Sequence, residues 1–233
     1  MSALAYNKKL NTFQFKYTLM TGLESLFASS GSVFRLLTEE ERQASLSASL
    51  AHWQPGQDVW VFGYGSLVWR PEFEFSERRP AVINGYHRAL CLWSRVNRGT
   101  PERPGLVFGL DIGGSCRGVA YRIAAGLVPD TLHALWQREM PSGAYIPKWL
   151  NCRSAQGPIR ALTFTMDRSK QAYVRGLSKE QLVAIVQGAH GTYGPCTEYV
   201  LETAQALKQA GIRDKKLENL LHHLQSTGAD QHE

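Results

Sequence analysis

Short apolar runs separated by glycine-containing turns begin at Val59 and fill the middle of the chain, and each run has the length of a β-strand. After the run at Val59, the clearest runs are Ala81–Ile83, Leu106–Leu110, Gly118–Ile123 and Ile159–Met166. Runs that follow one another so closely favour antiparallel neighbours. The pattern therefore predicts a sheet built largely from hairpins.

Two glycine-containing segments between these runs are predicted to be hairpin turns. Asn84-Gly85 separates Ala81–Ile83 from a strand that begins at Tyr86, and Asn-Gly is a strong two-residue turn signal. Asp111–Ser115, with two adjacent glycines, stands in the same position between the next two runs. Both segments are expected to reverse the direction of the chain.

Segments with helical spacing of apolar residues interrupt and follow the strands. They are Pro129–Met140, Ser178–Gln187, Thr197–Ala210 and Lys215–Gln225. Gly211 stands where a glycine cap would end the third of them. Because the helices do not alternate regularly with the strands, we predict an α+β fold with a curved or barrel-like mixed sheet rather than a βαβ fold.

Residues 1–58 read as an N-terminal extension that is partly helical or disordered. Thr38 followed by Glu39–Glu41 predicts a helix start, because threonine caps the first turn and acidic residues there suit the helix dipole. Leu46 and Leu50 are expected to dock this helix on the core. The extension is therefore predicted to be separate from the sheet that begins at Val59.

The composition narrows the choice of function. The chain has 233 residues, 43% of them hydrophobic, a net charge of +6 and a pI near 9.2. Basic residues are scattered, which argues against nucleic-acid binding and is compatible with a small anionic substrate. No apolar run approaches 18 residues and no secretory signal is evident, so we expect a cytoplasmic protein without membrane insertion.

Neither the cysteines nor the histidines have the spacing of a metal site. The four cysteines are far apart, with no C-x-x-C pair, and the seven histidines show no H-x-x-x-H spacing. Cys91 lies in an apolar run and reads as a small core residue. We therefore expect reduced thiols and no metal.

The segment Gly63-Tyr64-Gly65-Ser66 ends the first strand and fits none of the common glycine motifs. Val68 stands where a dinucleotide-binding loop needs its third glycine, no lysine is present for a P-loop, and the G-x-S-x-G pattern around Ser66 is missing. A glycine-hinged turn whose backbone amides can bind an anion is one interpretation. An ordinary β-bulge or tight turn is the equal alternative.

Glu139 is placed unusually for an acidic residue. It lies seven residues after Leu132, on the apolar stripe of the predicted helix Pro129–Met140, and in the last turn, where the helix dipole disfavours a negative charge. Both features raise a carboxyl pKa and are typical of functional acids. In the alternative interpretation, Glu139 turns to the rim and pairs with a base such as Arg138 or Arg122.

These elements together resemble the ChaC-like glutathione-specific γ-glutamylcyclotransferases. The segments VFGYGSLVW, RPG, GVAYRI, LWQREM and TEYVLE occur in the family's order over residues 60–212. The resemblance implies a γ-glutamylcyclotransferase-like small mixed β-barrel with flanking helices, over a domain at residues 59–226 between the extension and a tail at 227–233. It also implies that Glu139 is the acid/base and that a loop binds the γ-glutamyl group. The residues of that loop are Val61, Phe62, Gly63, Tyr64, Gly65 and Ser66.

The implied reaction converts glutathione to 5-oxoproline and cysteinylglycine without a cofactor. Arg98 is a candidate to pair with a substrate carboxylate, with a solvated loop arginine as the alternative. Tyr199 either reaches the substrate pocket or packs in the core. Two other functions stay open: cyclotransfer on other γ-glutamyl amino acids or amines, and a non-catalytic regulator associated with cation transport. Glutathione is the expected partner, and we expect a monomer or a weak dimer.

Overall fold

A closed five-stranded β-barrel forms the centre of the computed structural model, which describes Leu23, Phe27 and residues 35–229. The strands are β1 (Val59–Gly63), β2 (Glu77–Ser94), β3 (Gly105–Ile123), β4 (Tyr145–Ser154) and β5 (Gly157–Met166). Their order is β1-β3-β2-β4-β5, and β5 closes the barrel by parallel pairing with β1 and β3. The other pairings are antiparallel. The predicted small mixed barrel is confirmed, although β4 was not among the predicted strands.

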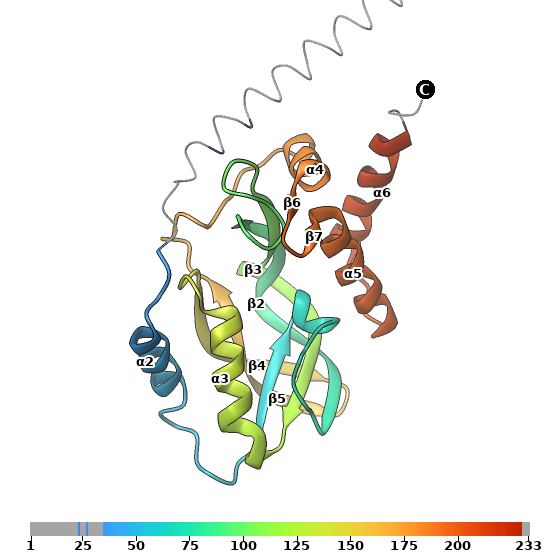
Figure 1. The fold of residues 1–233 in the computed structure, drawn as a ribbon. Coiled ribbons are helices and arrows are strands. Elements are labelled where there is room, and N and C mark those ends of the chain that lie inside the picture. The colour runs from blue at the N-terminus through green and yellow to red at the C-terminus, as the bar shows by residue number, and fades with distance from the viewer. Residues whose placement is uncertain (1–22, 24–26, 28–34, 230–233) are drawn as a thin grey trace, which may run out of the picture.

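Helices cover two sides of the barrel (Figure 1). They are α2 (Glu39–Ser49), α3 (Val128–Glu139), α4 (Lys179–Gly188), α5 (Cys196–Gln209) and α6 (Lys215–Ala229). The short elements are the 3₁₀ turns η1 (Ser66–Val68) and η2 (Ala125–Leu127) and the two-residue strands β6 (His190–Gly191) and β7 (Gly194–Pro195). Helices α2 and α3 lie on one side, and α4, α5 and α6 lie on the other. The four helices predicted after residue 128 all form, and Gly211 ends α5 with a φ of 70° as expected.

The two predicted hairpin turns, at Asn84-Gly85 and Asp111–Ser115, are wrong. β2 and β3 each run through these segments without reversing, and they pair with each other on both sides of them. Gly85 has a φ of 83°, and Gly113 and Gly114 have φ values of 106° and 72°, so the glycines form facing irregularities in one long ribbon. Glycine at positive φ occurs in turns and in bulges alike. Which of the two forms depends on strand pairing with residues distant in the sequence, here the pairing of β2 with β3.

The predicted N-terminal helix is confirmed as α2. Thr38 caps it: its side chain accepts from the Glu41 amide, while the Glu41 carboxylate accepts from the Thr38 amide. Leu46 is buried in a cluster with Trp136 of α3, and Leu50 packs against the same cluster. Residues 1–22 lie outside the described residues. The division into an extension, a domain over 59–226 and a tail stays a prediction.

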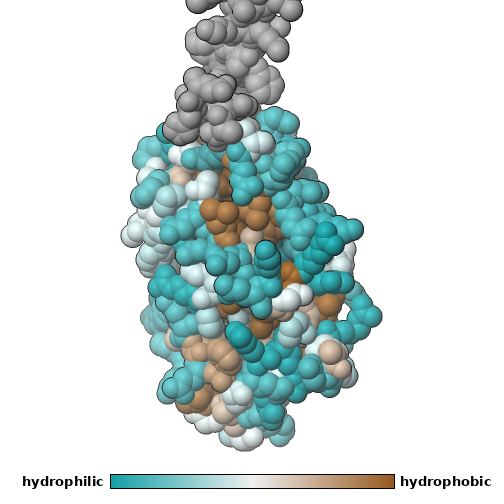
Figure 2. Space-filling model, turned by 90° about the vertical axis from the view of Figure 1, so that its right-hand side faces the viewer, coloured by the Kyte–Doolittle hydropathy of each residue, from teal (hydrophilic) through white to brown (hydrophobic). Residues whose placement is uncertain are grey.

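The second face of the barrel is covered by α5 and α6. Tyr199, Val200 and Leu207 of α5 are buried in the largest core cluster, together with Phe62 of β1 and other barrel residues. Seen from the side that carries these two helices, the surface is mostly hydrophilic around a central group of hydrophobic residues (Figure 2). The core therefore has a large cluster under α5, a second cluster under α3 and a small third one around Cys91 and Met166, and β1 contributes residues to the first two.

Candidate active site

The glycine segment lies where the central strand β1 ends. β1 pairs with β3 on one side and with β5 on the other, and the chain then turns through Tyr64 and Gly65 into η1. A Cβ built on Gly118 would lie 2.3 Å from the Gly63 carbonyl oxygen, and one on Gly63 would lie 2.9 Å from Cβ of Leu67. Both positions therefore need glycine because the backbones approach so closely.

The turn is held by hydrogen bonds and still leaves two of its backbone amides unused. The Tyr64 hydroxyl donates to the Phe164 carbonyl at 2.8 Å, and the Val68 amide donates to the Gly65 carbonyl at 3.0 Å. Among the hydrogen bonds of the described residues, none has the amide of Tyr64 or Gly65 as its donor. Two adjacent free amides are what an anion-binding turn requires.

The residues predicted to form the γ-glutamyl-binding loop differ in what they can offer a ligand. The side chains of Val61 and Phe62 are fully buried in the core, so only their backbone groups are available. Phe62 also gives its carbonyl to the Thr163 hydroxyl at 3.0 Å. Ser66 is partly exposed and its hydroxyl takes part in a side-chain hydrogen bond. The polar groups of the loop are therefore concentrated between Tyr64 and Ser66.

Helix α3 carries Glu139 to the barrel. Leu132, Leu135 and Trp136 are buried on one face of α3, and Glu139 is the last residue of the helix, with a side chain only 15% exposed. Burial raises the pKa of the Glu139 carboxyl above its ordinary value of 4.5, and the Arg138 guanidinium opposes this shift. The expected position on the apolar stripe is confirmed. Its catalytic role stays a prediction.

Arg138 joins the acid to the glycine segment. Its Nε lies 3.2 Å from Oε1 of Glu139, and its Nη2 donates to the Ser66 hydroxyl at 3.0 Å. Its Nη1 donates to Glu72 at 2.9 Å. Glu139 thus pairs with Arg138, as the alternative interpretation allowed, yet stays largely buried instead of turning to the rim. The link from Arg138 to Ser66 was missed from the sequence.

Three tyrosine hydroxyls gather around the Glu139 carboxylate. They belong to Tyr64 at the end of β1, Tyr145 at the start of β4 and Tyr199 of α5. Burial raises the pKa of all three hydroxyls, and the nearby negative charge of Glu139 adds to the increase. The three hydroxyls therefore keep their protons at neutral pH. The Tyr145 hydroxyl donates to the Phe108 carbonyl at 3.5 Å.

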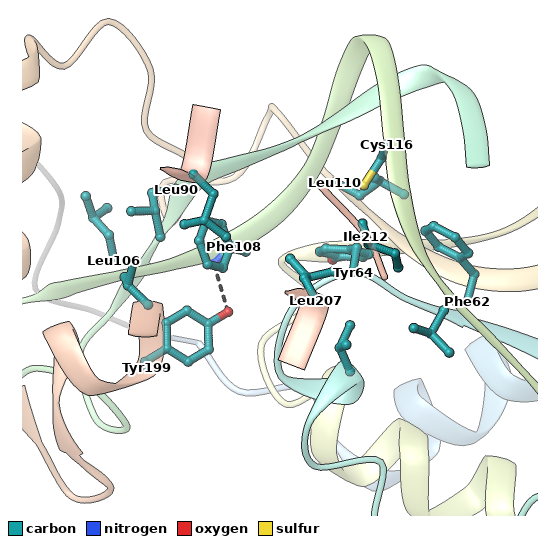
Figure 3. Close-up of a cluster of buried hydrophobic side chains, with 14 of the residues drawn as sticks. Phe62, Tyr64, Leu90, Leu106, Phe108, Leu110, Cys116, Tyr199, Leu207 and Ile212 are labelled. Carbon is teal, nitrogen blue, oxygen red and sulfur yellow. Dashed lines mark hydrogen bonds between the residues drawn. The ribbon is translucent and has the colours of Figure 1, made fainter. Parts of the chain in front are cut away.

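Of these tyrosines, Tyr199 was predicted from the sequence as a candidate site residue and Tyr145 was not. Tyr199 was a candidate, and the structure shows its hydroxyl accepting from the Phe108 amide at 3.0 Å (Figure 3). Tyr199 packs in the core, as one earlier interpretation held, and its contact with a substrate stays a prediction. Tyr145 was missed, because it opens β4, which the pattern did not predict. The tyrosine six residues after Glu139 was the available signal.

Arg98 is buried instead of solvated. It is only 6% exposed, so the solvated loop arginine is wrong. Its guanidinium donates to the Pro195 carbonyl at 3.1 Å, and it pairs with Glu198 at 3.2 Å and Glu202 at 3.4 Å on α5. It also lies 5.7 Å from the ring of Tyr199. These contacts favour a structural role beside the site, and its binding of a substrate carboxylate stays a prediction.

Comparison with known proteins matches this chain to one family. The model of the ChaC-like proteins matches residues 59–227, which is most of the chain. The chain belongs to the ChaC-like family. A family member from Escherichia coli K12, named glutathione-specific gamma-glutamylcyclotransferase, is 36% identical over 187 residues, which cover 80% of this chain and 81% of the relative.

Two further comparisons agree with this assignment. Human glutathione-specific gamma-glutamylcyclotransferase 1 is 31% identical over 160 residues, covering 66% of this chain and 72% of the human protein. The crystal structure of a yeast gamma-glutamyl cyclotransferase specific to glutathione has a TM-score of 0.67 at 22% identity, covering 72% of this chain and 96% of the yeast chain. The latter likeness supports the fold.

The described residues contain neither a membrane-spanning helix nor a cluster of metal ligands. No helix in residues 35–229 is long and apolar enough to cross a membrane. In the same part of the chain, no group of three or more acidic, histidine or cysteine side chains is arranged to hold a metal ion. The four cysteines are buried free thiols, with Cys91 packed inside β2 as expected.

Proposed function

We propose that this chain is a glutathione-specific γ-glutamylcyclotransferase that converts glutathione to 5-oxoproline and cysteinylglycine. The observation that carries the proposal is the meeting of a buried carboxylate with a turn of free backbone amides, joined by one guanidinium. The relatives' names supply the substrate. An anion-binding turn beside a carboxylate of raised pKa suits a substrate that carries a carboxylate and an amine.

The reaction is an intramolecular amide exchange. The α-amine of the γ-glutamyl group attacks its own γ-carbonyl carbon, a C–N bond forms in a five-membered ring, and the bond to the cysteinyl nitrogen breaks. The proton lost by the amine goes to the leaving nitrogen. The reaction therefore consumes no water and needs no oxidant. Holding the substrate folded turns attack into a favourable intramolecular step.

Glu139 is the proposed proton carrier. An α-amine has a pKa near 8 and an ordinary glutamate one near 4.3, a gap that makes transfer unfavourable by about 5 kcal/mol. Burial raises the pKa of Glu139 and narrows this gap. Glu139 takes the proton from the attacking amine and returns it to the departing cysteinyl nitrogen.

The turn at Tyr64 and Gly65 is proposed to bind the negative charge of the substrate. Its free amides suit either the α-carboxylate or the oxyanion that develops on the attacked carbonyl. Arg138 contacts both Ser66 and Glu139, which keeps the Glu139 carboxylate at a fixed distance from the turn. A monomer or weak dimer acting in the cytoplasm stays a prediction.

Product analysis tests this proposal. Purified protein is incubated with glutathione, and 5-oxoproline and cysteinylglycine are measured by mass spectrometry, beside γ-glutamylcysteine, γ-glutamylalanine and a γ-glutamylamine. Equal amounts of the two products from glutathione, with little turnover of the other substrates, are expected. Turnover of only the other substrates would move the specificity to γ-glutamyl amino acids or amines. No turnover of any of them would overturn the enzymatic assignment.

A further inference from the structure

Arg88 is a buried arginine directly behind the turn after β1. It lies in β2, and its side chain is only 2% exposed. Its Nε donates to the Tyr64 carbonyl at 2.5 Å. Its other two nitrogens donate to the Arg117 carbonyl of β3 and to a carboxylate oxygen of Asp214. One guanidinium thus binds three segments that are far apart in the sequence.

The geometry of this contact determines where an amide of the turn points. The Tyr64 carbonyl and the Gly65 N–H belong to the same planar trans peptide, so they point in opposite directions. Arg88 holds the carbonyl toward the protein interior. The Gly65 amide, which has no donor bond among those of the described residues, is therefore directed to the opposite side of the turn.

Asp214 extends this arrangement to the C-terminal helix. Its Oδ1 accepts from the amides of Lys216 at 3.1 Å and Leu217 at 3.2 Å, so it caps the first turn of α6. Its Oδ2 faces Arg88. Leu217 is buried in the same core cluster as residues of α5 and the barrel. The carboxylate thus holds Arg88 from a helix end that is itself anchored.

We propose that Arg88 and Asp214 are a positioning pair that fixes the orientation of the substrate-binding turn, with α6 as its support. The inference rests on the proposed function. Arg88 suits this task because its planar fork donates in several directions at once, which a lysine ammonium on a flexible stem does not reproduce. Removing the carboxylate would leave a buried guanidinium with only carbonyl partners and free it to shift.

The test removes the charge of Asp214 while keeping the helix cap. Asp214→Asn and Asp214→Ser both place a good N-cap residue before α6. Asp111→Asn is the matched control, because Asp111 is also a carboxylate paired with an arginine, Arg168, and its hydrogen-bond partners lie outside the turn. The readouts are kcat and KM for glutathione, melting temperature, and hydrogen exchange of the amides of residues 68–70.

With the α-carboxylate bound at the turn, we expect the two Asp214 variants to raise KM about tenfold with kcat changed less than about twofold, since a misdirected amide then weakens substrate and transition state alike. Exchange at residues 68–70 should quicken in the Asp214 variants only. Arg88→Lys should raise KM further, and it supplies the test if an Asp214 variant fails to fold. If the wild-type protein does not turn over glutathione, the proposed function is refuted. Hydrogen exchange at residues 68–70 would then still show whether Arg88 and Asp214 fix the turn.

The proposal is overturned if KM and exchange at residues 68–70 stay at wild-type values in both Asp214 variants. It is also overturned if Asp111→Asn changes them to the same extent, because the effect would then follow from general loss of stability.

Discussion

Two buried carboxylates in this barrel have opposite surroundings. Asp111 of β3 accepts from the Arg168 guanidinium at 2.7 Å, the Ile112 amide at 2.9 Å and the Tyr173 hydroxyl at 2.9 Å. Burial alone would raise the pKa of Asp111, but these donors reverse the effect and the pKa is lowered. Glu139 faces one guanidinium, which does not offset its burial, and its pKa is raised.

The difference is the one expected between a structural acid and the proposed reactive one. The lone pairs of Asp111 are engaged by donors from its own strand and from the segment after β5, so its charge is stabilised and unavailable for proton transfer. Glu139 is held at one oxygen by Arg138, and the tyrosine hydroxyls around it are neutral. Burial alone therefore does not distinguish the two carboxylates; the number of donors around each one does.

The largest effect should be seen in turnover. Glu139→Gln keeps the size and shape of the side chain but cannot accept a proton, so kcat for glutathione should fall by about 10³-fold. Asp111→Asn, the matched change at the satisfied acid, should keep kcat within about threefold of wild type. Steady-state kinetics of both purified variants provides the comparison. A Glu139→Gln enzyme with a near-normal rate would eliminate Glu139 as the proton carrier.

Stability should respond in opposite directions to the same two substitutions. The folded-state pKa of Asp111 lies below its unfolded value of 3.8, so its ionised form stabilises the fold above that pH and the contribution is lost as pH falls through the lower value. Asp111→Asn should therefore cost about 2 kcal/mol at pH 7, or about 4–8 °C in melting temperature.

For Glu139 the folded-state pKa is above 4.5, so stability present below pH 4.5 is lost as pH rises through the folded value. Glu139→Gln should therefore melt a few degrees above wild type at pH 8, by about 1 kcal/mol. The gain should vanish near pH 4. Melting temperatures of wild type, Asp111→Asn and Glu139→Gln, measured from pH 4 to pH 8, test both expectations. Destabilisation by Glu139→Gln at pH 8 would mean that Glu139 is as well satisfied as Asp111.

Local signals were sufficient for some elements of this molecule and insufficient for others. The cap at Thr38, the stop at Gly211 and the placement of Glu139 on the apolar face of α3 are properties of a few neighbouring residues, and the structure confirms them. The irregularities at Gly85 and at Gly113-Gly114 were mistaken for turns, because the same positive φ values serve both and the pairing of β2 with β3 is a long-range property.

In the candidate site, too, the residues with a local signal were predicted and those placed by long-range contacts were not. The turn after β1 and the acid of α3 stand out in the sequence because each breaks a local rule. Arg88, Asp214 and Tyr145 do not, since each reads as an ordinary strand or helix-end residue until the fold brings it near the turn or the acid. Arg98 was expected in a loop, and its burial against Glu198 and Glu202 depends on how α5 packs.

The pH dependence of kcat for glutathione, measured for wild type and Arg138→Gln, tests most directly whether burial prepares Glu139 to accept a proton. The carboxylate must be ionised to act, so kcat should fall on the acid side with a midpoint above 4.5. Arg138→Gln removes the charge that opposes the shift, and its midpoint should move to higher pH. A wild-type midpoint at or below 4.5, or one that does not move in the variant, would contradict the account.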